Sequence, residues 1–183
     1  MKPTLIVLVG PSGAGKTTLA RLAAQIDLAT HVIRSVTTRA QGPNEDDFEY
    51  VFIKKEDFDP SMCIENAEYD GNYYGILKDE IEQALATERP IAAAEIHGAR
   101  QIKEYCKDRA IVQLVFVDAP DKELRHRLET RGRGNVDARM ARVEKDRESR
   151  DECDFIIVNR NNARYVSIEA LNEIYNEGSL SYA

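Results

Sequence analysis

The residues best suited to chemistry lie at 10–17, where the sequence reads GPSGAGKT. This segment fits the pattern GxxxxGK[ST], follows a short apolar run and precedes a helical pattern. Glycines let the backbone approach an anion closely, and successive N–H groups at a helix N-terminus then bind phosphate. We expect Lys16 to reach the β- and γ-phosphates and the Thr17 hydroxyl to hold Mg²⁺. The segment predicts a nucleoside triphosphate site; the alternative is a glycine-rich turn without a ligand.

The elements that would position this loop form an alternating series. Apolar runs that lack strict alternation predict buried parallel strands at Thr4–Val9, His31–Val36, Pro90–Glu95, Ile111–Val117 and Phe155–Asn159. Helical patterns separate them at Lys16–Gln25, Gly98–Cys106, Asp121–Thr130, Val136–Glu152 and Asn162–Glu177. The series predicts an α/β fold with a parallel five-stranded sheet flanked by helices and joined by right-handed crossovers.

Two segments interrupt this series. Residues 37–76 contain short β-like pieces at 50–53, 64–69 and 73–75, with many tyrosines beside polar residues, and predict an inserted β-rich lobe. Residues 131–137 form a break with glycine and arginine between two helices, which is typical of a lid. We expect one domain over residues 1–183, with a core of residues 1–36, 77–130 and 138–183, the lobe at 37–76 and the lid at 131–137.

The charge is unevenly distributed along the chain. The 183 residues include 25 Lys and Arg against 32 Asp and Glu, a net charge of -7. Residues 125–150 hold nine basic and five acidic side chains, which leaves 16 basic and 27 acidic ones elsewhere. The overall acidity excludes a general nucleic-acid or membrane-surface binder, while the basic segment suits a phosphoryl-transfer site. Three distant cysteines (Cys63, Cys106 and Cys153) and no metal-ligand spacing favour a reduced, cytoplasmic protein.

Four further segments carry a family resemblance. They read SVTTR at 35–39, ENAEYDGNYYG at 65–75, EIHGARQ at 95–101 and CDFIIVN at 153–159. Together with the phosphate loop, and in this order, they resemble guanylate kinase over nearly the whole chain. The resemblance implies a P-loop kinase fold with a lobe that binds a nucleoside monophosphate (NMP) and a short helical lid. It also implies Mg²⁺-dependent transfer of the ATP γ-phosphoryl group to GMP or dGMP.

The resemblance implies an acceptor site made of Ser35, Arg39, Tyr50, Glu65, Tyr74 and Glu95. Arg39 would bind the acceptor phosphate with the two tyrosine hydroxyls, and its fork suits a phosphate dianion. Glu65 would accept hydrogen bonds from the guanine N1–H and amino group, which a carboxylate can do because it only accepts. Ser35 would bind the base edge, and Glu95 stands where the family usually has aspartate. Alternatively, Glu65 is a solvated strand residue and the tyrosines pack the lobe.

The resemblance also implies donor-site and catalytic roles. The implied ATP contacts are Gly10, Ser12, Gly13, Ala14, Gly15, Lys16, Thr17, Thr18 and Asn159, and the implied catalytic residues are Lys16, Arg39, Arg131 and Arg139. Arg133 and Arg142 are weaker candidates in the same basic segment. Arg125, Arg147 and Arg150 are interpreted as a solvated, salt-bridged helix face, because residues such as Glu144 lie at helical spacing from Arg147.

The chain departs from the family pattern at four places. Gly42 stands where a second phosphate-binding arginine is usual, Ile76 replaces Ser or Thr, Ala93 replaces an aspartate, and the lid at 131–139 is about three residues shorter. A substitute for the missing arginine could come from Arg34, Lys54 or Lys55. Because the changes fall on the acceptor side, alternatives remain: a modified purine nucleotide or ribose 1,5-bisphosphate as acceptor, or a non-catalytic binding module. We expect small-molecule nucleotides as partners, and a monomer or homodimer.

Overall fold

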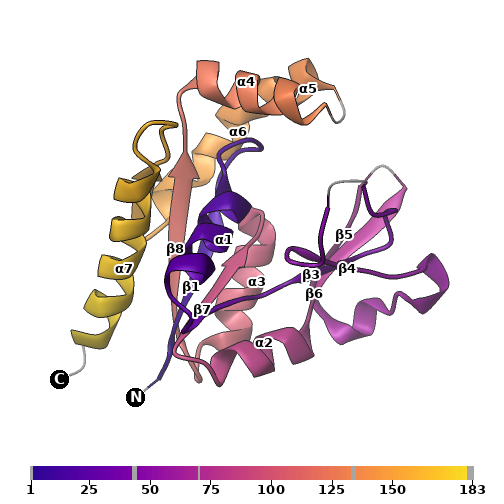
Figure 1. Ribbon diagram of the computed structural model, residues 1–183. Coiled ribbons are helices and arrows are strands. Elements are labelled where there is room, and N and C mark those ends of the chain that lie inside the picture. The colour runs from indigo at the N-terminus through magenta and orange to yellow at the C-terminus, as the bar shows by residue number, and fades with distance from the viewer. Residues whose placement is uncertain (1, 43–44, 70, 133–134, 181–183) are drawn as a thin grey trace.

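The computed structural model describes residues 2–42, 45–69, 71–132 and 135–180, and a parallel five-stranded sheet forms its centre (Figure 1). The strand order is β2 (Thr30–Val32), β7 (Arg89–Ala93), β1 (Thr4–Val9), β8 (Ile111–Asp118) and β9 (Phe155–Val158). Neighbouring strands pair in parallel throughout. Every residue of β1 is buried, because helices cover both faces of the sheet. The predicted α/β class and the five-stranded parallel sheet are confirmed.

Alternate residues of β1 lie in two hydrophobic clusters, one on each face. Ile6 and Leu8 pack with side chains of α1 (Lys16–Ile26) and α7 (Arg164–Leu180). Leu5, Val7 and Val9 pack on the other face with α2 (Lys78–Leu85) and α3 (Ile96–Cys106). The loop that follows β1 is thus held between two packed layers. Within the described residues, no helix has the length and apolar character needed to cross a bilayer.

A second sheet projects to one side of the core (Figure 1). Its strand order is β4 (Tyr50–Phe52), β3 (Ser35–Thr37), β6 (Asn72–Leu77) and β5 (Cys63–Tyr69). Pairing of β6 with β3 and with β5 is antiparallel, whereas β3 and β4 are parallel. We call residues 35–77 the small sheet, and it contains all three β-like pieces that the sequence predicts.

The predicted strand His31–Val36 is wrong as a single element. Its first half is β2 of the core, and its second half is β3 of the small sheet. Between them the Arg34 backbone N–H and guanidinium donate to Glu80 at 3.3 and 2.7 Å. Glu80 lies on α2, a helix that the sequence analysis did not predict. The apolar run therefore crosses from one sheet to the other at an ion pair.

The predicted helix Val136–Glu152 is also wrong as one element. The chain instead forms α5 (Val136–Ala141), α6 (Val143–Arg147) and a 3₁₀ turn at Glu148–Glu152. The Ser149 hydroxyl donates to the Asp146 carbonyl at 2.6 Å, and such a bond competes with the helical ladder. The preceding helix α4 (Asp121–Arg131) ends at Gly132, whose φ is +62°. The basic segment is thus a chain of short helices above the phosphate loop.

Gly10 offers a test of how tightly the loop joins the core. Its φ is +138°, and a Cβ there would lie 2.1 Å from the Val117 carbonyl oxygen. We expect Gly10→Ala to lower the free energy of unfolding by at least about 2 kcal/mol, because backbone must move to admit the methyl group. Gly71→Ala is the matched control, since Gly71 has a φ of +69° but open space around it. Urea unfolding measures both; equal losses would contradict this prediction.

Candidate active site

The phosphate loop joins β1 to α1 and encloses the Lys16 ammonium. Lys16 Nζ donates to the Gly10 and Pro11 carbonyls at 2.6 and 3.1 Å. Gly15 caps α1 in the left-handed region with a φ of +93°, and a Cβ there would lie 2.4 Å from Asn159 Nδ2. The loop is therefore a tight backbone cup at a helix N-terminus, which is the arrangement that binds phosphate.

Burial lowers the pKa of Lys16. The pKa of the Lys16 ammonium is lowered to about 8, chiefly by desolvation on burial and to a smaller extent by the nearby Arg131 cation. The carboxylates of Asp146 on α6 and of Glu95 after β7 act in the opposite direction. Groups from three separate elements therefore converge on the lysine of the loop.

This lowered pKa predicts how anion binding depends on pH. A bound polyphosphate favours the ammonium form and raises the Lys16 pKa, so binding takes up a proton wherever the free lysine is neutral. We expect ATP affinity to be constant below about pH 8 and then to fall by up to about tenfold per pH unit. Calorimetry at about pH 7 and about pH 9 in two buffers of different ionisation enthalpy measures affinity and proton uptake. The same affinity at both values would contradict the prediction.

A cavity of about 350 Å³ opens beside the loop. Its walls come from the loop, α4 and the segment after β9: Gly13, Gly15, Thr18, His126, Arg127, Thr130, Arg131, Asn159, Asn161 and Arg164. Asn159 Nδ2 donates to the Ala14 carbonyl at 2.8 Å, whereas the buried Asn159 Oδ1 has no hydrogen-bond partner among the described residues. Such a cavity next to a phosphate cup suits the rest of a nucleotide, and the predicted donor residues Gly13, Gly15, Thr18 and Asn159 all line it.

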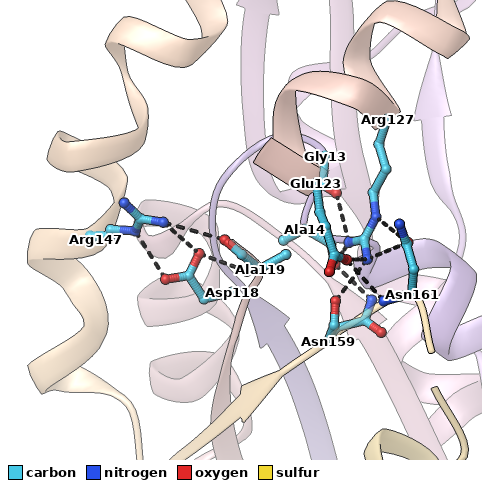
Figure 2. Close-up of polar contacts among 9 residues, drawn as sticks. All are labelled: Gly13, Ala14, Asp118, Ala119, Glu123, Arg127, Arg147, Asn159 and Asn161. Atoms are coloured by element: carbon cyan, nitrogen blue, oxygen red, sulfur yellow. Dashed lines mark hydrogen bonds and ion pairs between the residues drawn. The ribbon is translucent and has the colours of Figure 1, made fainter. Parts of the chain in front are cut away.

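Arg127 is a residue of this site that the sequence analysis missed. Figure 2 shows its guanidinium between the loop and the segment after β9, surrounded by oxygen atoms. It donates to the Gly13, Ala14 and Asn159 carbonyls and to the Asn161 and Glu123 side chains. Burial lowers the pKa of Arg127. Its partners are mostly backbone carbonyls distant in sequence, so no residue spacing could have indicated them.

Three of the predicted acceptor residues meet in the small sheet. The Arg39 guanidinium carbon lies 5.4 Å from the Tyr50 ring centre, and the Tyr50 and Tyr74 rings lie edge to face at 6.3 Å. Arg39 also forms a two-pronged ion pair with Glu45, with distances of 2.7 and 2.9 Å. This pair raises the Arg39 pKa. At the position of the missing arginine, the Gly42 N–H donates to the same carboxylate at 2.8 Å.

The other acceptor candidates lie where the small sheet meets α3. A Cβ on Gly98 would lie 2.9 Å from the Glu65 carboxyl carbon, so this glycine leaves room for the carboxylate. Burial, with the Glu95 charge as a second cause, raises the Glu65 pKa. Glu95 itself caps α3 and lies 3.9 Å from an Arg142 nitrogen. Ser35 begins β3 in register with Tyr50.

The departures from the family pattern have different surroundings. Ile76 is 1% exposed and belongs to the core cluster with α2 and α3, so its side chain serves packing. Ala93 packs against the opposite cluster. Of the suggested substitutes for the missing arginine, Arg34 is paired with Glu80 and Lys54 with Glu56. Lys55 lies over the Tyr73 ring, with Nζ 5.9 Å from the ring centre.

The lid arginines divide into two groups. Arg131 ends α4 and lines the cavity, and Arg139 Nη1 donates to Ser12 Oγ at 3.5 Å. Arg125 forms an exposed pair with Asp137, and Arg150 is exposed. The candidate Arg133 lies outside the described residues.

The prediction that Arg147 belongs to a solvated, salt-bridged helix face is wrong in part. It has the expected partner Glu144 at 2.8 Å, yet it also binds Asp118 at 2.9 Å and Asp121 at 2.6 Å. Its side chain is 23% exposed, and Figure 2 shows its guanidinium bonded to Asp118 and Ala119 at the end of β8. Arg147 therefore fixes α6 to the core, a contact that local helical spacing could not indicate.

The parallel sheet, the phosphate loop between β1 and α1, and the arginines above it define a P-loop kinase. Comparison with known proteins gives the family. The family model for guanylate kinase matches residues 2–177. A guanylate kinase of Rubrobacter xylanophilus is 37% identical over 184 residues, covering 93% of this chain and 94% of its own. The chain belongs to the guanylate kinase family, and thus to the nucleoside monophosphate kinases.

Further relatives agree with this assignment. A guanylate kinase of Salinibacter ruber is 36% identical over 166 residues, and the match covers 85% of this chain and 87% of the relative. The crystal structure of guanylate kinase from Anaplasma phagocytophilum superposes with a TM-score of 0.76 at 22% identity, covering 99% of this chain and 88% of that one. At this identity the structural match supports the fold alone.

Proposed function

We propose that this protein transfers the γ-phosphoryl group of ATP to GMP, and to dGMP, with Mg²⁺. The observation that carries the proposal is the meeting of lid and loop, where Arg139 reaches Ser12 beside the enclosed Lys16. Phosphoryl transfer needs positive charge placed around the transferred group and the exclusion of water. The lysine and the two lid arginines, Arg131 and Arg139, supply that charge.

The acceptor side supplies its own contacts. Arg39, with the Tyr50 and Tyr74 hydroxyls, would hold the acceptor phosphate, and Ser35 and Glu65 would hold the base. An acceptor phosphate oxygen is already a nucleophile, so no residue has to remove a proton from it. In the described structure the Arg39 fork is bound to Glu45, and the acceptor phosphate would compete with this carboxylate.

A magnesium ion would be held at Thr17. Among the described residues, no group of three or more His, Cys, Asp or Glu side chains could hold a metal. Mg²⁺ commonly takes only one or two protein ligands and completes its shell with phosphates and water, so this finding fits the ion. Burial raises the pKa of the nearby Glu49 carboxyl, and the Thr17 hydroxyl acts weakly in the opposite direction, so a second oxygen-bearing side chain lies close to Thr17. When bound, the ion would neutralise charge on the phosphates.

Two other functions are less well supported. A ribose 1,5-bisphosphate acceptor has no base, and would leave the Glu65 carboxylate without its proposed partner. A non-catalytic module would not need the enclosed lysine or the lid arginine at the loop. A modified purine that keeps the guanine-like donors fits the same contacts as GMP.

The deciding experiment is a coupled assay of ADP release. Candidate acceptors are GMP, dGMP, AMP, dAMP, UMP and ribose 1,5-bisphosphate, each with Mg²⁺ and ATP. We expect the guanine nucleotides to give the highest kcat/KM. Equal rates with all acceptors would overturn the proposed base recognition, and calorimetry that detects no ATP binding would favour the non-catalytic module.

The cellular compartment, the oligomeric state and the binding partners are also part of the proposal. The three cysteines are free thiols, and burial raises the pKa values of Cys106 and Cys153 to about 11. Buried, protonated thiols are inert and suit a reducing compartment. We therefore place the protein in the cytoplasm, as a monomer or homodimer that binds nucleotides and neither nucleic acid nor membrane.

A further inference from the structure

The carbonyl groups of the phosphate loop point at Arg127. Its Nη1 donates to the Gly13 carbonyl at 3.3 Å and to the Ala14 carbonyl at 3.1 Å. The Ala14 carbonyl also accepts from Asn159 Nδ2 at 2.8 Å, so two donors from outside the loop hold one oxygen. The Arg127 side chain is 13% exposed, and Glu123 at 2.8 Å balances its charge.

These contacts decide where the loop N–H groups point. In a trans peptide the C=O and the following N–H point to opposite sides of the chain. Holding the Ala14 carbonyl toward Arg127 therefore turns the Gly15 N–H away from Arg127. Holding the Gly13 carbonyl does the same for the Ala14 N–H, which donates to Pro11 at 3.2 Å.

Bonds within the loop hold the Gly10 and Pro11 carbonyls, whereas the donors to the Gly13 and Ala14 carbonyls lie outside it. Gly13 and Gly15 both have positive φ values, of +88° and +93°, and glycine reaches many other conformations at little steric cost. A loop with this freedom needs outside partners to remain in one form when no anion is bound. Arg127 and Asn159 are those partners in the described structure.

The same guanidinium links the loop to its surroundings. Arg127 Nε and Nη2 donate to Asn161 Oδ1 at 3.0 and 2.8 Å, and Asn161 lines the cavity beside the loop. Arg131 lies one turn further along α4, so the helix that carries a lid arginine is fixed to the loop at Arg127. Arg127 therefore connects the phosphate loop, the cavity wall and the helix that carries the lid arginine Arg131.

We propose that Arg127 is a positioning residue that holds the phosphate loop in its anion-binding form. The proposal rests on the proposed binding of ATP and adds to it a residue that acts through the loop backbone. It requires that Arg127 raise the affinity of the loop for the phosphates of ATP, independently of any contact that Arg127 makes with the base.

The test separates these two roles with a ligand that has no base. Calorimetry with Mg²⁺ measures the affinities for ATP and for inorganic tripolyphosphate in the wild type and in Arg127→Lys. We expect both affinities to fall by about tenfold or more, because a lysine cannot span the carbonyls that the guanidinium fork holds. Arg125→Lys, on the same helix but in an exposed pair, should match the wild type.

The outcomes are distinct. Weaker ATP binding with unchanged tripolyphosphate binding would overturn the proposal and assign Arg127 to the base, and no change in either would also overturn it. A wild type that binds neither ligand would instead contradict the proposed function. If circular dichroism shows that Arg127→Lys does not fold, the test uses Asn159→Ala, which removes the other donor to the Ala14 carbonyl. A tripolyphosphate affinity equal to that of the wild type would then overturn the proposal.

Discussion

Lys16→Ala is expected to reduce kcat by about a thousandfold or more while the protein remains folded. The ammonium is the charge that the loop encloses, bound at present to the Gly10 and Pro11 carbonyls. Transferred phosphoryl oxygens would lose that partner, whereas packing of β1 and α1 does not depend on it. A coupled ADP-release assay with saturating Mg²⁺, ATP and GMP measures the effect.

The control for this substitution is Lys122→Ala, which removes an exposed lysine on α4. Its kcat should equal that of the wild type. Thermal unfolding of both variants should lie within about 5 °C of the wild type, since a shift of that size corresponds to only about 1–2 kcal/mol in a protein of this length. Near-normal turnover by Lys16→Ala would refute the proposed mechanism.

Glu65→Gln is expected to remove the preference for guanine. A carboxylate can accept from both the N1–H and the amino group, whereas a glutamine amide offers one acceptor and opposes the other donor with its own NH₂. We expect kcat/KM for GMP to fall by about a hundredfold or more and the rates with AMP and UMP to change little. Glu68→Gln, an exposed residue on the same strand, is the matched control.

The same variant has a second readout in stability. Burial raises the Glu65 pKa above its unfolded value, which means that the folded state disfavours the ionised form. The cost applies above the folded-state pKa and disappears as the pH falls below the unfolded value. At neutral pH, Glu65→Gln should therefore unfold at a higher urea concentration than the wild type. A less stable variant that still prefers GMP would contradict both the electrostatic and the functional argument.

The features of the site that were predictable from sequence are those fixed by local backbone chemistry. The phosphate loop is one: Gly10, Gly13 and Gly15 all have positive φ values, and the loop lies between a strand and a helix as predicted. The parallel sheet was equally predictable, because strands buried on both faces read as continuous apolar runs. The roles of Glu65 and Arg39 remain predictions, although the structure gives each a definite environment.

Other features were hidden because their causes are distant in sequence. Arg127 binds carbonyls 113 and 114 residues away, and a carbonyl has no residue type to reveal it. Arg147 was interpreted from its neighbour Glu144, while the decisive partner, Asp118, belongs to another element. The apolar run His31–Val36 gave no sign that Arg34 would leave the core sheet to meet Glu80. Long-range polar contacts, more than packing, limited the prediction.

The antiparallel pairing of β3 with β6 has a consequence for how this protein can evolve. Val36 pairs with Gly75 and Thr37 with Tyr74, so the chain enters the small sheet and returns from it through neighbouring strands. Segments whose two ends lie together can be inserted or exchanged with little disturbance to the rest of the fold. The segment between these paired residues can therefore change in evolution as one unit. Gly42 lies within this segment and outside the donor site, whereas Ile76 lies just beyond the closing pairs and packs in the core cluster with α2 and α3.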